Sequence, residues 1–350
     1  MSIHTIDDLR QRQALPLEVK IRMSEQRIRE WVYEFGLEGV YISFSGGKDS
    51  TALLHLARRL YPDIKAVFVD TGLEYPEIRD FVKTFDNVDV VRPKLTFKQV
   101  IQKYGYPFIS KEVSQQVYEA IKGAEKNHIK PRQTNTYKRK FDPNSEYIKR
   151  FPRFSLEKYD YLFDAPFIMS HKCCAIMKKA PAKAYEKKTG RRAILATMTD
   201  ESRLRETEWL KNGCNAFNSP RPTSKPFSFW TEQDILTYIK QNNITICSVY
   251  GDIVPDNTAR DALAGQLDIA DYGLINDTRP LKTTGCARTG CMFCGFGCHL
   301  EKEGEGRFER MKITHPKQYD YIMRPADRGG LDYKNIIDWL NTNGHLNIRY

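Results

Sequence analysis

The sequence predicts an open α/β fold, in which a mostly parallel, twisted sheet carries helices on both faces. From residue 38 to about 115, short apolar segments rich in β-branched residues alternate with amphipathic segments of helical length. A glycine-containing turn follows the first apolar segment, and a second polar turn follows the next one. This alternation is typical of parallel strands joined by crossover helices, and ligands bind beyond the carboxyl ends of such strands.

The elements follow in chain order. We expect a strand at 39–44, a helix at 50–60, a strand at 65–69, a helix at 75–85 and a strand at 88–92. A further strand is predicted at 192–197, and a short helix is predicted to begin at Thr231, where Thr-Glu-Gln-Asp resembles an N-terminal cap. The predicted parts are a helical segment at 1–37, an α/β domain at 38–215 and a smaller cysteine-rich region at 216–350.

The most informative motif is the octapeptide Ser-Phe-Ser-Gly-Gly-Lys-Asp-Ser at residues 43–50. It joins a predicted strand to a predicted helix, where exposed backbone N–H groups and the helix dipole attract an anion. Lys48 adds a positive charge, and the carboxylate of Asp49 suits a magnesium ion. The predicted phosphate-binding residues are Ser43, Ser45, Gly46, Gly47, Lys48, Asp49 and Ser50. The motif is not a Walker loop, because Ile42 stands where that loop needs its first glycine.

Composition and charge limit the setting of the chain. The formal net charge is +11 and 41% of the residues are hydrophobic, but no apolar run approaches the roughly 20 residues that cross a bilayer. We therefore expect a cytoplasmic protein without a membrane partner. Lysine, arginine and aromatic residues interleave at 118–155, a pattern that suits a nucleic acid. The alternative is a solvated insertion whose aromatic side chains pack locally.

Six of the eight cysteines fall into two groups, namely Cys173-Cys174 and Cys286, Cys291, Cys294 and Cys298. A disulfide framework is not expected in a cytosolic chain of this length. The spacing of the second group is compatible with a zinc site or an iron–sulfur site, and reduced structural thiols are the remaining alternative. Cys214 and Cys247 have no partner pattern, and buried or free thiols account for them.

The octapeptide resembles the PP-loop of ATP pyrophosphatases, enzymes that cleave ATP between the α- and β-phosphates. The run Asp70-Thr71-Gly72-Leu73-Glu74 after the second strand resembles the phosphoadenylylsulfate (PAPS) reductase branch of that superfamily. The resemblance implies a PP-loop fold, ATP and Mg²⁺ as cofactors, and a place near the adenine or the metal for Asp70, with Thr71 and Gly72 beside it.

The paired cysteines and the late Gly-Cys-x-x-Cys resemble the cluster-bearing adenylylsulfate (APS) reductases, in which such pairs hold a [4Fe–4S] cluster. Carried over by position, this resemblance makes Cys173, Cys174, Cys291 and Cys294 the ligands, with Cys286 and Cys298 as alternates and zinc as the alternative metal.

Two departures from the reductases matter. Ala196-Thr197-Met198 stands where they carry Gly-x-Arg, and no cysteine follows Cys298, although they use a nucleophilic cysteine in a C-terminal tail. These departures favour the DNA phosphorothioation ATP pyrophosphatases, which the chain also resembles. We therefore expect an enzyme that adenylates a nucleic acid for sulfur transfer from a cysteine desulfurase or another sulfur carrier. The predicted catalytic residues are Lys48, Asp49, Arg203 and Arg205.

Two alternatives remain open at this point. One is a sulfonucleotide reductase that uses thioredoxin and Cys298, and the other is a non-catalytic component that binds nucleotide or nucleic acid. The sequence leaves the oligomeric state open.

Overall fold

The computed structural model describes residues 4–256 and 279–350 of the chain. The chain forms two compact units, each assembled from separate segments. The first unit comprises Met1–Asp70, Glu74–Val91 and Ala182–Thr289, and the second comprises Thr71–Leu73, Arg92–Pro181 and Gly290–Tyr350. The boundaries at residues 37 and 215, which rest on sequence patterns, stay a prediction.

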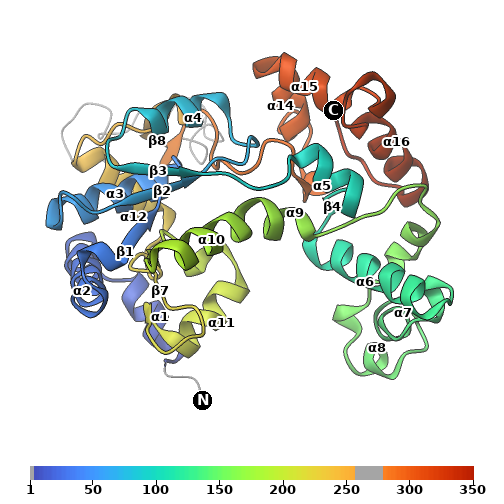
Figure 1. The fold of residues 1–350 in the computed structure, drawn as a ribbon, viewed down its shortest axis with the longest axis horizontal. Coiled ribbons are helices and arrows are strands. Elements are labelled where there is room, and N and C mark those ends of the chain that lie inside the picture. Colours follow the sequence, from blue (N-terminus) through green and yellow to red (C-terminus); the bar gives the residue numbers. More distant parts are fainter. Residues whose placement is uncertain (1–3, 257–278) are drawn as a thin grey trace. The chain divides into compact units, whose positions relative to one another are not determined.

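A six-stranded sheet forms the centre of the first unit, with the strand order β3-β2-β1-β5-β7-β6 among the described residues (Figure 1). Its strands are β1 (Val40–Ser43), β2 (Ala66–Val69), β3 (Val88–Val91), β5 (Arg192–Ile194), β6 (Asn215–Ala216) and β7 (Thr223–Ser224). Neighbouring strands pair in parallel, except that β6 runs antiparallel to β7. The predicted open, mostly parallel sheet is therefore confirmed.

The two faces of β1 carry different layers, as the alternation of strand side chains requires. Val40 and Ile42 lie in a large core that also contains residues of α2, α3 and α12. Tyr41, between them, packs on the opposite face against Tyr185 of α10, with the ring centroids 5.4 Å apart. Helices therefore cover both faces of the sheet, as predicted.

The helices of the first unit are α1 (Ile6–Gln13), α2 (Leu17–Phe35), α3 (Lys48–Leu60), α4 (Pro76–Lys83), α10 (Ala180–Thr189), which begins at the boundary with the second unit, α11 (Arg203–Asn212) and α12 (Glu232–Gln241). Thr231 caps α12 by accepting the N–H of Asp234, whose carboxylate accepts the N–H of Thr231, so the cap predicted there is confirmed. An antiparallel pair, β8 (Ile253–Pro255) and β9 (Leu281–Thr283), flanks the residues that the structure does not describe.

The second unit is mainly helical, and a short parallel pair joins two of its segments. β4 (Phe108–Ile109) pairs with β10 (Gly295–Phe296), and a Cβ atom at Gly295 would lie 2.5 Å from the ring of Phe108. Its helices are α5 (Phe97–Tyr104), α6 (Lys111–Asn127), α7 (Asn135–Lys140), α8 (Glu146–Arg150), α9 (Lys172–Cys174), α14 (Arg307–Thr314), α15 (Pro316–Met323) and α16 (Tyr333–Gly344). No helix of the described residues is long and apolar enough to cross a membrane.

Candidate functional site

The glycine loop after β1 lies at the point where the strand order of the sheet reverses. From the carboxyl end of β1 the chain passes to β2 on one side, whereas from β5, the neighbour of β1 on the other side, it passes to β6 and β7 in the opposite direction; open α/β sheets bind ligands at such a point. Gly46 has φ +73°, and a Cβ atom there would lie 2.8 Å from Cγ2 of Val82. Glycine is needed at this position, because a side chain would both strain the backbone and displace α4.

Two serines of the octapeptide hold the loop in shape. The backbone N–H of Ser45 donates to Oγ of Ser50 at 3.1 Å, and the two Oγ atoms are 3.0 Å apart. Ser50 Oγ also donates to the carbonyl of Gly47 at 2.9 Å. Ser43 is the last residue of β1 and pairs in register with Val67, so its predicted role in phosphate binding stays a prediction.

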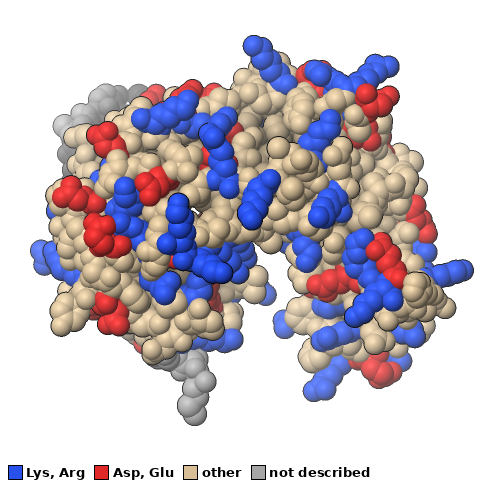
Figure 2. Space-filling view, viewed as in Figure 1, with Lys and Arg blue, Asp and Glu red and all other residues tan. Residues whose placement is uncertain are grey.

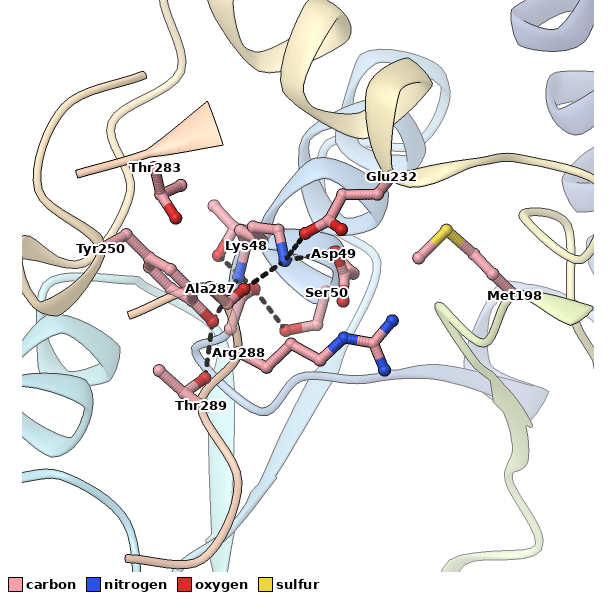
Figure 3. A network of polar contacts seen from close by, with 12 residues as sticks. Lys48, Asp49, Ser50, Met198, Glu232, Tyr250, Thr283, Ala287, Arg288 and Thr289 are labelled. Carbon is pink, nitrogen blue, oxygen red and sulfur yellow. Dashed lines mark hydrogen bonds and ion pairs between the residues drawn. The ribbon is translucent and has the colours of Figure 1, made fainter. Parts of the chain in front are cut away.

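Lys48 is a buried cation with oxygen partners from separate segments of the chain. Its side chain is only 2% exposed, and its Nζ donates to the carbonyl of Ala287 at 2.8 Å. Nζ also lies 3.1 Å from Oε1 of Glu232 and 3.7 Å from Oδ1 of Asp49 (Figure 3). The charge predicted for phosphate binding is thus held at the first turn of α3 by a carbonyl and two carboxylates.

Tyr250 occupies the amino end of α3. The backbone N–H of Lys48 donates to its hydroxyl at 3.1 Å, and the hydroxyl is 2.5 Å from Oγ1 of Thr289 (Figure 3). Burial raises the pKa of Tyr250 to about 12, so the phenol is neutral at physiological pH. A neutral hydroxyl therefore uses the helix N–H that an incoming anion would otherwise accept.

Asp49 has the properties expected of a magnesium ligand. Its Oδ1 is buried and has no hydrogen-bond donor among the described residues. Burial raises the pKa of this carboxyl group above its ordinary value, while the charge of Lys48 acts in the opposite direction. An unsatisfied carboxylate oxygen in such a position suits a hard cation, so the side chain present here fits Mg²⁺.

Arg205 and Arg288 share the carboxylate of Glu201. Arg205, on α11, forms an ion pair with Glu201, and Nη1 of Arg288 lies 3.6 Å from Oε1 of the same residue. Burial and then the charge of Arg288 lower the pKa of Arg205, whereas the charge of Asp49 acts to raise it. The structure thus brings Arg205 into the electrostatic range of the loop.

Arg203 does not share this environment. It is exposed on the first turn of α11, and no ion pair joins its side chain to any described residue. Its predicted catalytic role stays a prediction.

The second predicted motif begins at Asp70, which is 6% exposed. Its Oδ2 accepts a hydrogen bond from Nη2 of Arg79 at 3.1 Å. Oγ1 of Thr71 accepts the N–H of Leu73 at 3.1 Å, and Gly72 has φ +74° with open space where a Cβ atom would lie. These contacts shape a turn after β2, and the adenine or metal role of the three residues stays a prediction.

Four predicted cluster ligands lie in the second unit and interact electrostatically. A hydrogen bond with Cys174 and burial raise the pKa of Cys173, and the charges of Cys291 and Cys294 contribute in the same direction. A hydrogen bond with Cys173 lowers the pKa of Cys174 to about 6 and burial raises the pKa of Cys294, while the charge of Lys111 acts to lower both. Thiols are the donors that zinc and iron–sulfur centres take, but among the described residues no three His, Cys, Asp or Glu side chains stand together as a metal site, so the ligand set stays a prediction.

Two side chains donate hydrogen bonds to the backbone of the cysteine segment. Arg307 donates from Nη1 to the carbonyl of Cys294 at 2.7 Å and from Nε to Glu301 at 2.6 Å. The hydroxyl of Tyr333, which is fully buried, donates to the carbonyl of Phe293 at 2.6 Å. These bonds fix the backbone around one predicted ligand, as outer-shell groups do in metal sites.

The remaining cysteines differ in setting. Cys298 is 3% exposed, its Sγ donates to the carbonyl of Gly295 at 2.9 Å, and burial raises its pKa to about 12. Cys286 belongs to the first unit, unlike the other predicted ligands. Cys214 and Cys247 are buried, as expected of thiols that only pack.

The basic segment at 118–155 packs many of its aromatic rings against its own side chains. Phe141 is fully buried and stacks on Tyr137 with centroids 5.7 Å apart. The guanidinium of Arg139 lies 4.5 Å from the ring centroid of Tyr147, and that of Arg153 lies 4.7 Å from the centroid of Phe154. The local packing that we considered as an alternative is therefore present, and nucleic-acid binding by this segment stays a prediction.

Sequence reasoning missed Tyr250, Thr289 and Arg288, and it treated Glu232 only as part of a helix cap. Two backbone hydrogen bonds join the segment of Tyr250 to the segment of Arg288 and Thr289, which is distant in sequence. Cys286 N–H donates to the carbonyl of Val249, and Gly285 N–H donates to that of Tyr250. Glu232 follows the cap residue of α12, so the cap motif was the one local signal for it.

The fold and the site define an open α/β protein whose glycine–lysine–aspartate loop lies where the strand order of its sheet reverses. The profile of the phosphoadenosine phosphosulfate reductase domain matches residues 39–295, and the chain belongs to that family.

Curated relatives match the chain over short stretches. It is 41% identical over 70 residues to an uncharacterised protein of Methanocaldococcus jannaschii, covering 19% of this chain and 17% of the relative. It is 35% identical over 79 residues to a phosphoadenosine 5′-phosphosulfate reductase of Xylella fastidiosa, covering 23% and 32%. It is 29% identical over 83 residues to an adenosine 5′-phosphosulfate reductase of Staphylococcus haemolyticus, covering 22% and 34%. The matches thus span about a third or less of these relatives.

Among solved structures, the PAPS reductase of Candida auris in a phosphate complex aligns with a TM-score of 0.36 at 13% identity. The alignment covers 64% of this chain and 82% of that one. A similarity at this TM-score says nothing about the site, which is described above from the chain's own residues.

Proposed function

We propose that the chain is a magnesium-dependent ATP pyrophosphatase that adenylates a nucleic acid for sulfur transfer. The observation that carries the proposal is the buried Lys48 beside Asp49, at the start of α3 and at the reversal point of the sheet. A buried cation, an unsatisfied carboxylate oxygen and a helix amino end together suit a polyphosphate with its metal ion.

In the proposed reaction, an oxygen of the acceptor attacks the α-phosphorus of ATP. The bond to the bridging oxygen breaks, pyrophosphate leaves with the electron pair, and the acceptor carries AMP. Lys48 and Arg205 neutralise the negative charge that develops on the phosphates, and Asp49 would hold Mg²⁺, which would supply further neutralisation. A sulfur donor such as a cysteine desulfurase or another sulfur carrier then presents a persulfide whose terminal sulfur attacks the activated atom. The bond to AMP breaks, AMP leaves with the electron pair, and a thiol reductant cleaves the resulting disulfide so that the sulfur stays on the acceptor.

We further propose that Cys173, Cys174, Cys291 and Cys294 bind a [4Fe–4S] cluster, which would supply sulfur-relay chemistry. Two observations support this set over one that includes Cys286. The thiols of the four cysteines shift one another's pKa values, and all four lie in the second unit, whereas Cys286 lies in the first. Anaerobic purification followed by iron and zinc analysis tests it. About four irons per chain and a brown protein are expected; a colourless protein with one zinc contradicts the cluster.

The activity is tested by pyrophosphate release from ATP and Mg²⁺ in the presence of DNA or RNA. Release is expected in the wild type and is expected to be lost in Asp49→Ala. Asp63→Ala is the matched control, because Asp63 is an exposed carboxylate in the turn after α3. Absence of ATP turnover with every nucleic acid contradicts the proposal, and nucleotide binding without AMP formation favours a non-catalytic component.

A second candidate is a sulfonucleotide reductase, because two of the relatives described above are reductases of this kind. This candidate needs a reactive thiol, and the burial and raised pKa of Cys298 count against that residue as the nucleophile. Sulfite release from APS or PAPS with a thiol donor would decide for the reductase.

A further inference from the structure

The second unit contains a cavity of about 570 Å³ that the glycine loop and the cysteines do not line. Its wall comes from the end of α5 and the residues after it, from residues 166–168, and from α16. The lining residues used below are Gly105, Tyr106, Phe167, Ile168, Asp332 and Trp339. A nucleotide-sized space of this kind, lined by aromatic rings and a few polar groups, is typical of a small-ligand site.

Three aromatic rings form its apolar wall. Tyr106, Phe167 and Trp339 are each half-buried, so part of each ring is accessible. Phe167 lies edge-on to Trp339 with centroids 5.3 Å apart at 85°, and Tyr106 lies edge-on to Phe167 at 6.1 Å and 82°. Edge-to-face packing fixes the rings relative to one another and offers a face to a planar ligand.

The backbone under this wall is fixed as well. Tyr106 N–H donates to the carbonyl of Ile168 at 2.8 Å, and a Cβ atom at Gly105 would lie 2.2 Å from that carbonyl oxygen. Glycine is thus required for two of the lining segments to approach each other. The cavity is therefore built by the fold and does not depend on a movable side chain.

Asp332 supplies the charged group of the cavity. It precedes α16 with φ +63°, and its Oδ1 accepts a hydrogen bond from Asn335 at 2.7 Å. No described residue donates a hydrogen bond to its Oδ2. Asp332 and Tyr106 both line the cavity, and the carboxylate charge, after burial, contributes to the raised pKa of Tyr106. The cavity thus joins aromatic faces to an acceptor for N–H groups.

The charge of the surrounding chain decides between ligand classes. An aromatic wall with a carboxylate suits either an organic cation or a base with N–H donors. Residues 92–181, which supply two of the three lining segments, hold 19 lysine and arginine residues against 8 aspartate and glutamate residues. Their excess equals the whole net charge of +11, so the field disfavours a cation and favours a ligand attached to phosphates.

One aromatic residue beyond the basic segment contacts the cavity wall. Tyr161, which follows it in the chain, stacks on Trp339 with centroids 5.9 Å apart. Figure 2 shows lysine and arginine side chains, with acidic side chains among them, over the part of this unit that Figure 1 labels α6, α7 and α8.

We propose that this cavity binds one unstacked nucleobase that carries an exocyclic amino group, with the aromatic wall stacking on the base and Asp332 accepting its N–H groups. The inference rests on the proposed function for the identity of the ligand as part of the acceptor nucleic acid. Stacking on an aromatic side chain contributes about 1–3 kcal/mol per base, and a carboxylate accepts from the amino group of cytosine.

The tryptophans of the chain provide a selective probe. Trp31, Trp209 and Trp230 are 0%, 2% and 0% exposed, whereas Trp339 is half-buried in the cavity wall. Titration with single-stranded oligodeoxycytidylate in the absence of ATP is expected to quench the Trp339 fluorescence to saturation. Oligodeoxythymidylate of equal length, which has the same backbone but no amino group, is expected to bind at least fivefold more weakly.

Variants separate the base site from backbone binding. Phe167→Ala is expected to weaken oligodeoxycytidylate binding by tenfold or more, whereas Tyr33→Ala, an aromatic residue that is 93% exposed on α2, is expected to leave it unchanged. Asp332→Asn is expected to remove the preference for cytosine while the protein stays folded, because asparagine tolerates the same left-handed backbone. Trp339→Phe, followed by anisotropy of a labelled oligonucleotide, is expected to keep the preference.

The proposal is overturned if anisotropy detects oligonucleotide binding without quenching of Trp339, if both oligonucleotides bind equally, or if neither binds. None of these results would contradict ATP turnover by the glycine–lysine–aspartate loop. Conversely, normal base binding without AMP formation contradicts the proposed enzyme and supports the cavity, so the two failures are distinguishable.

Discussion

The hydroxyl of Tyr250 and an incoming phosphate compete for the backbone N–H of Lys48. Tyr250→Phe removes the competitor but keeps the ring, so we expect pyrophosphate to bind two- to fivefold more tightly, while the free energy of unfolding falls by about 1 kcal/mol. Isothermal titration and urea unfolding measure the two effects. Tyr238→Phe is the control, because its buried hydroxyl bonds to His55 at 2.9 Å and not to the loop. Equal pyrophosphate affinity in both variants contradicts the competition.

Asp49 makes stability depend on pH with a definite sign. Because its pKa is raised in the folded protein, the folded state holds the proton more tightly than the unfolded chain. Protonation of Asp49 therefore favours folding. At neutral pH the charged carboxylate lowers the free energy of unfolding, and this loss disappears as the pH falls through the folded pKa toward 3.8. We expect Asp49→Asn to be more stable than the wild type at pH 7, with the difference shrinking toward pH 4 in urea unfolding. A constant difference would argue that the carboxyl titrates normally; exposed Asp63→Asn serves as the reference.

At the scale of elements, α14 holds the cysteine segment through Arg307. Arg307→Gln leaves Glu301 without its partner and releases the carbonyl of Cys294, so we expect a loss of about 1.5–3 kcal/mol in the free energy of unfolding. Arg310→Gln, on the same helix, removes an exposed arginine that donates to the carbonyl of Glu305, and we expect a change within about 0.5 kcal/mol. Urea unfolding of both variants measures this; similar losses contradict the role of Arg307.

The elements predictable from the sequence are those with local causes. The strand predicted at 39–44 lies at 40–43, the helix predicted at 50–60 begins at 48, and the cap predicted at Thr231 is present, because apolar periodicity, glycine and capping residues lie within each segment. The packing of Tyr250 and Thr289 onto Gly47 depends on contacts between distant segments, which no local pattern encodes. The same holds for the cavity wall, where Trp339 and Phe167 are separated by 172 positions but lie 5.3 Å apart.

At the scale of the whole molecule, the charge of the chain is concentrated in residues 92–181. A triple variant replaces three exposed lysines of this segment with glutamate, namely Lys126, Lys130 and Lys138. We expect it to bind single-stranded DNA more weakly, and we expect the slope of the logarithm of the binding constant against the logarithm of the salt concentration to fall by up to about 2. Reversal of Lys187, Lys188 and Lys211, which are exposed in the first unit, is the matched control and is expected to have a smaller effect. Equal effects from both triple variants would mean that only total charge matters.

The central claim is that the Lys48–Asp49 loop directs cleavage of ATP between the α- and β-phosphates. Phosphorus NMR of the products formed from ATP, Mg²⁺ and nucleic acid tests this claim most directly, because it identifies the broken bond. We predict signals of AMP and pyrophosphate in the wild type and their loss in Asp49→Ala. Formation of ADP and phosphate, or AMP formation that survives in Asp49→Ala, would contradict the account.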